Sequence, residues 1–195
     1  MSCKNRIIDF NYPLPEDKIA IYPVNKRDNS KLLVYRDEKI SEDTFNNISR
    51  HIDDNSLLIF NNTKVVKARL IFHKTTGAKI EIFCLEPPNY NNISTELESR
   101  GSVKWNCLVG NSRRWTSGEL SASITIDGRE VKIRATRMTQ NSDHSEIFFE
   151  WDSEDTFAEI LDNFGRIPLP PYIHREAQDS DNDRYQTVYA STNGS

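Results

Sequence analysis

The hydrophobic pattern of the chain changes at residues 61–64, and this change limits the possible folds more than any other feature. Residues 57–60 (LLIF) are four consecutive apolar residues, which is typical of a strand covered on both faces in a parallel sheet. Residues 65–151 instead show short strands and hairpins without a helical stripe, and such a stripe returns at Thr156. The sequence therefore predicts two architectures in one chain.

Polar residues at 61–64 directly follow the predicted strand. Open α/β sheets place ligands beyond the carboxyl ends of their strands, so this segment is a candidate binding site as well as a hinge. The alternative is an ordinary polar loop that leaves a strand and binds nothing.

The first sixty residues favour a β-α-β organisation. A proline followed by two acids predicts a short helix over 15–21, and the run at 32–35 (LLVY) predicts a strand. Ser41 precedes two acids and a helically spaced apolar stripe, which predicts a helix over 41–52 lying on the sheet. The strand at 57–60 would complete the unit.

Strand patterns with alternating polarity fill the middle third. The predicted strands are residues 67–73, 79–84, 103–109, 123–126, 129–134 and 146–151. Asp127-Gly128 is a strong signal for a type I′ hairpin turn, and residues 89–102 resemble a long polar loop. Six strands suffice to close a small barrel that has no free edge, so we predict an inserted six-stranded antiparallel β-barrel.

After the predicted barrel, residues 157–164 have an apolar helical face, and Gly165 stands where that helix should stop. Three prolines within 167–173 exclude a helix or a central strand and predict a stiff extended segment. This segment is either a rigid crossing or the wall of a ligand site. An acidic helix start at 179–183 leads into an amphipathic stretch at 184–190.

Composition and motifs exclude several classes of protein. The chain has only 7 glycines and no glycine-rich phosphate loop, which disfavours Rossmann and P-loop chemistry. The 3 cysteines and 4 histidines are scattered without the spacing of a disulfide framework or a metal site, so we expect no metal. Without a bilayer-length apolar run or a signal peptide, we expect a cytoplasmic monomer that has no membrane partner.

The net charge of −4 argues against nucleic-acid binding by bulk electrostatics, but charge is unevenly distributed. Residues 64–150 carry 13 Lys and Arg against 10 Asp and Glu. This excess, which includes Arg113-Arg114 next to Trp115, fits either phosphate contact or a solvated strand face.

Six stretches in a fixed order carry a resemblance to a known family. They are residues 19–23 (IAIYP), 27–34 (RDNSKLLV), 61–70 (NNTKVVKARL), 77–81 (GAKIE), 165–173 (GRIPLPPYI) and 183–190 (DRYQTVYA). Together they resemble the S-adenosylmethionine:tRNA ribosyltransferase-isomerase family of queuosine biosynthesis, from about Leu14 to Ser195.

The resemblance implies an enzyme that uses S-adenosylmethionine as a ribosyl donor and tRNA, at its anticodon arm, as the acceptor. Such an enzyme transfers and isomerises the ribosyl group onto 7-aminomethyl-7-deazaguanine at the wobble position, forming epoxyqueuosine and releasing adenine and methionine. No metal is needed, because a sulfonium acidifies the adjacent ribose C5′ hydrogen and a positioned base can start the rearrangement.

The resemblance also implies the fold class, an α/β domain of three-layer α/β/α type with an inserted β-barrel. Residues 1–64 would form the first part of that domain, residues 65–151 the barrel, and residues 152–195 the return to the α/β domain. Members of the family continue with a second α/β half that carries a P-T-A-G-L-H-F motif. We therefore expect this chain to be a truncated piece that completes neither the sheet nor the active site alone.

Site residues follow from the positions that match the motifs. Arg27 and Asp28 are assigned tentative catalytic roles, with a polar or proton-transfer role for Asp28. The predicted substrate-binding residues are Ser30, Asn61, Thr63, Lys64, Arg69, Tyr172, Arg184, Tyr185 and Gln186, of which Lys64 and Arg69 are assigned to anion or phosphate contact. Structural alternatives stay open: Asp28 as a turn cap, Arg69 paired with Glu81 across a hairpin, and Tyr185 in the core.

Two positions depart from the commoner family pattern: Ile21 stands in place of a glutamine, and Lys67 in place of a proline. These departures indicate a divergent branch. Two other functions therefore stay open, a non-catalytic RNA-binding module and a divergent paralogue that acts on another nucleoside-like ligand.

Overall fold

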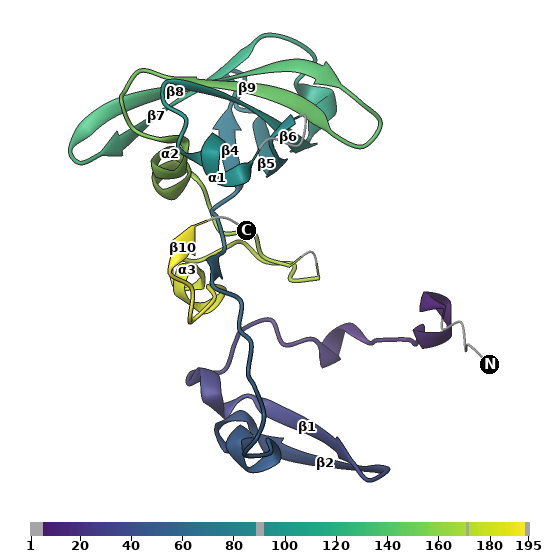
Figure 1. The fold of residues 1–195 in the computed structure, drawn as a ribbon. Coiled ribbons are helices and arrows are strands. Elements are labelled where there is room, and N and C mark those ends of the chain that lie inside the picture. Colours follow the sequence, from purple (N-terminus) through teal and green to yellow (C-terminus); the bar gives the residue numbers. More distant parts are fainter. Residues whose placement is uncertain (1–5, 89–91, 171, 194–195) are drawn as a thin grey trace. The chain divides into compact units, whose positions relative to one another are not determined.

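The computed structural model describes residues 6–88, 92–170 and 172–193 (Figure 1). The chain forms two compact units. One comprises Met1–Leu58 with Pro170–Arg175, and the other comprises Ile59–Leu169 with Glu176–Ser195.

The larger unit is built on a six-stranded antiparallel sheet (Figure 1). Its strands are β4 (Arg69–His73), β5 (Lys79–Glu86), β6 (Ser102–Gly110), β7 (Glu119–Ile126), β8 (Arg129–Gln140) and β9 (Ser145–Trp151), in the spatial order β4-β5-β6-β9-β8-β7. The edge strands β4 and β7 approach each other, so the sheet is nearly closed into a barrel. The predicted six-stranded antiparallel barrel is confirmed in this coarse form.

Side chains along the strands alternate between buried and more exposed positions, and the buried ones form the core. In β9, Ile147, Phe149 and Trp151 are buried, whereas the residues between them are only partly covered. Helix α2 (Phe157–Phe164) adds Phe157, whose ring lies 5.2 Å from that of Trp105 and 5.5 Å from that of Phe149. Each such buried side chain stabilises the fold by about 1.5–3 kcal/mol.

The predicted hairpin turn between β7 and β8 is confirmed. Asp127 and Gly128 have φ angles of 48° and 77°, the left-handed pair that a type I′ turn requires. Its twist matches that of the flanking strands, which pair in register from Glu119↔Thr136 to Ile126↔Arg129.

Helix α2 is held at both ends. Thr156 and Glu159 form a capping box, in which the Glu159 carboxylate accepts from the Thr156 main-chain N–H at 2.6 Å. The helix stops before Gly165, as predicted, but Gly165 has a φ of −74° and is not in the left-handed region. A Cβ at Gly165 would stand 1.9 Å from the Lys67 carbonyl oxygen, so close approach of two backbones is what requires glycine here.

The predicted long loop at 89–102 is wrong at residues 93–97. A short helix, α1 (Ile93–Leu97), begins after Asn92, whose side chain accepts from the Ser94 N–H at 2.9 Å. Leu97 is buried in the core and anchors the helix next to α2 (Figure 1). Two apolar side chains, Ile93 and Leu97, in a polar stretch gave too weak a periodic signal to reveal the helix, and residues 89–91 lie outside the described part of the chain.

A second, small sheet and a short helix complete the larger unit. Strand β3 (Thr63–Lys64) pairs in parallel with β10 (Thr192–Asn193), and α3 (Asp181–Arg184) precedes β10 in the chain. The expected helix start at 179–183 is confirmed in α3. Within the described ranges, no helix is both long and apolar enough to span a membrane.

The smaller unit contains an antiparallel hairpin of β1 (Lys31–Arg36) and β2 (Lys39–Thr44). It also contains the 3-10 helices η1 (Ile7–Phe10), η2 (Glu16–Lys18), η3 (Arg27–Asn29) and η4 (Phe45–His51). Another 3-10 helix, η6 (Ser112–Arg114), lies in the larger unit. None of residues 6–58 is buried.

Two helix predictions for this unit are wrong. The helix at 15–21 is reduced to the single turn η2, and the helix at 41–52 is instead β2 followed by η4. Asp37 and Glu38, with φ angles of 49° and 60°, turn the chain back so that β2 pairs with β1. Residues 41–44, which were expected to start the helix, pair with β1 in the hairpin instead. The apolar residues at 45 and 48 are three positions apart, which fits the three-residue turn of η4.

The predicted buried strand at 57–60 is also wrong. These residues have no regular secondary structure, no described strand pairs with them, and Leu57 and Ile59 are 85% and 87% exposed. A parallel strand depends on partners that are distant in sequence, and this run has none among the described residues.

We predict that Gly165→Ala destabilises the larger unit by about 1–3 kcal/mol, because its Cβ must displace the Lys67 and Leu161 carbonyls, which it would approach to 1.9 and 2.5 Å. Urea unfolding measures the change. The control is Gly77→Asn at an open turn with a φ of 81°, where asparagine is tolerated and a change under about 0.5 kcal/mol is expected. Equal costs for the two variants would contradict the close approach.

The capping box predicts a pH dependence of stability. Hydrogen bonds from Thr156, chiefly from its main-chain N–H, lower the pKa of Glu159 below its ordinary value of 4.5. Because this pKa is lower in the folded chain, the ionised Glu159 carboxylate stabilises the fold fully above pH 4.5. This stabilisation is lost as the pH falls through the folded-state pKa of Glu159. Glu159→Gln should therefore be less stable by about 0.5 kcal/mol at pH 6, and the difference should shrink by pH 3. A difference that is independent of pH would contradict this.

Candidate functional site

Three of the motif stretches meet at Val65. The Gln186 side chain accepts a hydrogen bond from the Val65 main-chain N–H at 2.7 Å and donates one to the Val65 carbonyl at 3.2 Å. Nearby, the Ser191 main-chain N–H and hydroxyl donate to the Asn62 side-chain oxygen at 3.0 and 2.9 Å. The predicted binding residue Gln186 is therefore a clamp on the backbone of the 61–70 stretch.

The third motif stretch, residues 165–173, is joined to the 61–70 stretch by main-chain hydrogen bonds. Arg69 and Arg166 exchange main-chain hydrogen bonds of 3.3 and 2.8 Å, which places the start of β4 beside the proline-rich segment. The Arg69 side chain lies across the hairpin with its Nε 3.2 Å from the Glu81 carboxylate. This ion pair is the structural alternative stated for Arg69, and a substrate contact by its guanidinium stays a prediction.

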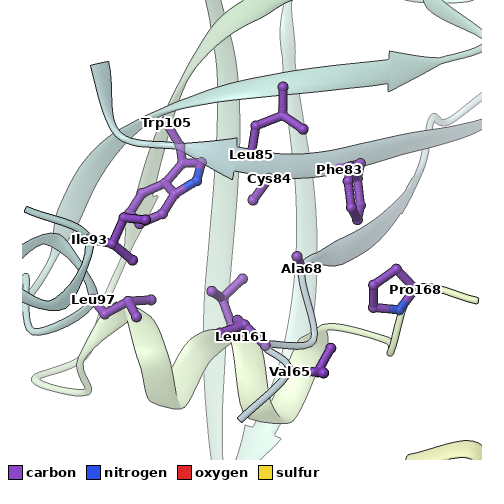
Figure 2. Close-up of a pocket in the computed structure, with 11 residues that line it drawn as sticks. Val65, Ala68, Phe83, Cys84, Leu85, Ile93, Leu97, Trp105, Leu161 and Pro168 are labelled. Atoms are coloured by element: carbon purple, nitrogen blue, oxygen red, sulfur yellow. The ribbon is translucent and has the colours of Figure 1, made fainter. Parts of the chain in front are cut away.

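Val65 and Val66 line an apolar cavity of about 210 Å³, and Figure 2 shows Val65 with most of the other lining residues. The other lining residues come from the residue before β4, from β5, β6, α1 and α2, and from the proline-rich segment: Ala68, Phe83, Cys84, Leu85, Ile93, Leu97, Trp105, Leu161 and Pro168. Trp105 is 3% exposed, and its indole N–H has no hydrogen-bond acceptor among the described residues. The cavity therefore combines an apolar lining with one nearby donor that lacks a partner.

A polar cavity of about 300 Å³ shares the lining residues Val65, Val66 and Leu97 with the apolar one. Its charged and amide side chains belong to Lys64, Lys67, Asp162, Asn182, Asp183 and Gln186. Lys67 donates to the Asp162 carbonyl at 2.7 Å in the last turn of α2, where a cation is favourable. The mixture of cations and carboxylates suits a ligand group that carries both charges.

Several predicted site residues shape the 61–64 segment or flank it. The Asn61 side chain accepts from the Thr63 N–H at 3.0 Å and from its hydroxyl at 2.6 Å, which fixes the turn into β3. Arg184 and Tyr185 are half-buried at the end of α3, so Tyr185 is not a core residue.

The remaining predicted residues lie in the smaller unit. Arg27 and Asp28 are exposed in η3, and the Ser30 hydroxyl donates to the Arg27 carbonyl at 2.8 Å. Tyr172 is exposed and belongs to the same unit, whereas its neighbour Pro171 lies outside the described residues. The predicted set is thus divided between the two units, with Asn61, Thr63, Lys64, Arg69, Arg184, Tyr185 and Gln186 in the larger one.

The sequence did not reveal the lining residues Val65, Leu97 and Trp105. Only Val65-Val66, an apolar pair inside a polar stretch, carried a local signal, because the other contributions depend on distant strands and helices. Across residues 6–88, 92–170 and 172–193, no three His, Cys, Asp or Glu side chains gather as a metal-binding group.

The site lies in a chain of a known family. The family model described as queuosine biosynthesis protein matches residues 7–195, so the chain belongs to that family. Proteins named S-adenosylmethionine:tRNA ribosyltransferase-isomerase are similar to it over 95% of its length. That of Desulfotalea psychrophila is 37% identical, that of Pelobacter propionicus 34% and that of Trichlorobacter lovleyi 32%. The resemblance inferred from the six motif stretches is confirmed.

The chain spans about half the length of these curated relatives, with 49–50% of each relative covered. No solved structure matches the chain closely enough to count as similar.

The clamp on Val65 generates a test. Gln186→Met removes both hydrogen bonds to Val65 and should cost about 2 kcal/mol of local stability, so the Val65 amide should exchange with solvent about 30-fold faster. Gln186→Glu keeps an oxygen acceptor for the Val65 N–H and should show a smaller increase. Hydrogen exchange followed by NMR measures both, and unchanged protection of Val65 in Gln186→Met would contradict the clamp.

Proposed function

We propose that this chain supplies the barrel and part of the substrate site of an S-adenosylmethionine:tRNA ribosyltransferase-isomerase. The observation that carries the proposal is the convergence of three motif stretches around residues 65–69, where Val65 and Val66 line both an apolar and a polar cavity. The apolar cavity alone is below the range of about 300–1,000 Å³ that is usual for small-molecule sites and the polar one is at its lower limit, but their combined volume lies within it.

The chemistry of the two cavities fits the two ends of S-adenosylmethionine. Its adenine is a flat, neutral aromatic ring with nitrogen acceptors, which suits the apolar cavity and the Trp105 N–H. Its methionine end is a zwitterion, which suits the polar cavity, with Lys64 near the carboxylate and Asp183 near the ammonium. The ribose between them would then lie over Val65 and Val66.

The proposed reaction starts at that ribose. The sulfonium acidifies the C5′ hydrogen, and a positioned base removes it, after which the ribosyl group is transferred to the aminomethyl group of the 7-deazaguanine at the tRNA wobble position. Rearrangement gives epoxyqueuosine and releases adenine and methionine. Asp28, with Arg27 beside it in the chain, is the proposed proton-transfer residue of the smaller unit.

We further propose that the 195-residue chain does not turn over alone. The apolar run at 57–60 is exposed, and none of residues 6–58 is buried, so this part of the smaller unit has no core of its own. A three-layer α/β/α domain would cover this run on both faces, and the relatives are long enough to supply the cover.

The test is adenine release from S-adenosylmethionine in the presence of tRNA that carries the aminomethyl-deazaguanine. The chain is assayed alone and after extension by the C-terminal half of the Desulfotalea psychrophila relative. We expect release only from the extended protein. Lys64→Met in it should lower kcat/KM at least 10-fold, because a charge-assisted contact with the substrate is lost.

The matched control is Lys132→Met, which removes an exposed lysine of β8 that lines neither cavity and should leave kcat/KM unchanged. Turnover by the 195-residue chain at the rate of the extended protein would contradict the proposed incompleteness. No adenine release from either protein, with tRNA still bound, would favour the non-catalytic RNA-binding module. Adenine release independent of the modified base would favour a paralogue with another acceptor.

A further inference from the structure

One end of the barrel gathers cations from two turns that are distant in sequence. Residues 73–79 join β4 to β5, and residues 110–118 join β6 to β7. These two turns contain Lys74, Lys79, Arg113 and Arg114 and no acidic residue. We call these four residues the basic end.

Two hydrogen bonds hold the two turns together. The Lys74 amine donates to the Arg114 carbonyl at 3.1 Å, and the Asn111 amide donates to the Lys79 carbonyl at 3.1 Å. Asn111 has a φ of 56°, which starts the tight turn of η6 that carries both arginines. The basic end is therefore a fixed arrangement of two adjacent turns.

Trp115 anchors the arginine turn in the core. It is 1% exposed, and its indole N–H donates to the Gly118 carbonyl at 2.9 Å. The Arg137 guanidinium lies 4.6 Å from the centre of its ring. Because this anchor directly follows Arg114, the two arginines are held at the surface without being drawn into the barrel.

The charges of the basic end are little neutralised. Arg113 and Arg114 are exposed, and neither makes an ion pair with a described residue. Lys79 has one carboxylate at 4.0 Å, from Glu176, whose side chain is 88% exposed. Two other arginines of the barrel face acids, Arg129 with Asp155 and Arg134 with Glu119. The basic end is thus a local positive patch on a chain of net charge −4.

Neutral donors surround the cations. Exposed hydroxyls of Thr75, Thr76, Thr116 and Ser117 lie on the same two turns. Arginine, lysine, serine and threonine side chains are the usual partners of phosphate oxygens in nucleic-acid backbones. A row of phosphates satisfies such a surface without any requirement for base sequence.

We propose that the basic end binds the phosphate backbone of the tRNA substrate and so orients the RNA on the barrel. The proposal rests on the proposed function for the identity of the RNA. It assigns the contact to the turns at 73–79 and 110–118, apart from the two cavities at Val65.

The test compares Kd values for a tRNA transcript at several salt concentrations. Arg113→Gln/Arg114→Gln should weaken binding about 10-fold at 100 mM salt and reduce the slope of log Kd against log salt by about 2, since two phosphate contacts are lost. The matched control, Lys104→Gln/Lys132→Gln, removes two exposed cations from other parts of the sheet and should change neither quantity. Circular dichroism confirms that both variants remain folded.

Equal affinity of the two double variants would overturn the assignment of the contact to the basic end. Absence of tRNA binding by the unmodified chain at 50 mM salt would overturn it as well, and so would binding to phosphatidylserine vesicles in place of tRNA. The proposed function is tested separately by adenine release from the extended protein, so failure here does not decide that question.

Discussion

Two hydrogen bonds between the Gln186 side chain and the Val65 main chain hold the candidate site together. The residues are 121 positions apart, and their contact brings the end of the chain back to the segment that enters the barrel. Pairing of β3 with β10 and the bridge between Arg69 and Arg166 extend this junction. Because Val65 and Val66 line both cavities, the shape of both depends on the position of this short piece of backbone.

The barrel gives that junction a rigid base. The Cβ-free Gly165 allows the end of α2 to touch the Lys67 carbonyl, and the capping box at Thr156 and Glu159 fixes the other end of the same helix. Lys67 stands where the commoner family pattern has proline, and its amine bonds to the last turn of α2. In this chain the departure thus supplies a contact to the barrel helix.

Local patterns predicted the barrel well and the smaller unit poorly. Alternating polarity and the Asp127-Gly128 turn identify strands whose partners are adjacent in sequence, so pairing follows from local information. The run at 57–60 has no such partner among the described residues. In the segment at 41–52, pairing of β2 with β1 prevailed over the helical spacing of the apolar residues, so no α-helix forms there. For the site, motif resemblance identified Lys64 and Gln186, but the clamp and the Trp105 lining arise only from long-range packing.

The central claim is that the three motif stretches form one site for S-adenosylmethionine at Val65. Titration of the extended protein with S-adenosylmethionine, followed by amide and indole NMR shifts, tests it most directly. We expect concerted shifts of Val65, Gln186 and the Trp105 indole N–H. The indoles of Trp115 and Trp151, already bonded to the Gly118 and Asp155 carbonyls, should stay in place. Saturable binding that leaves Val65 and Gln186 unshifted would contradict the account.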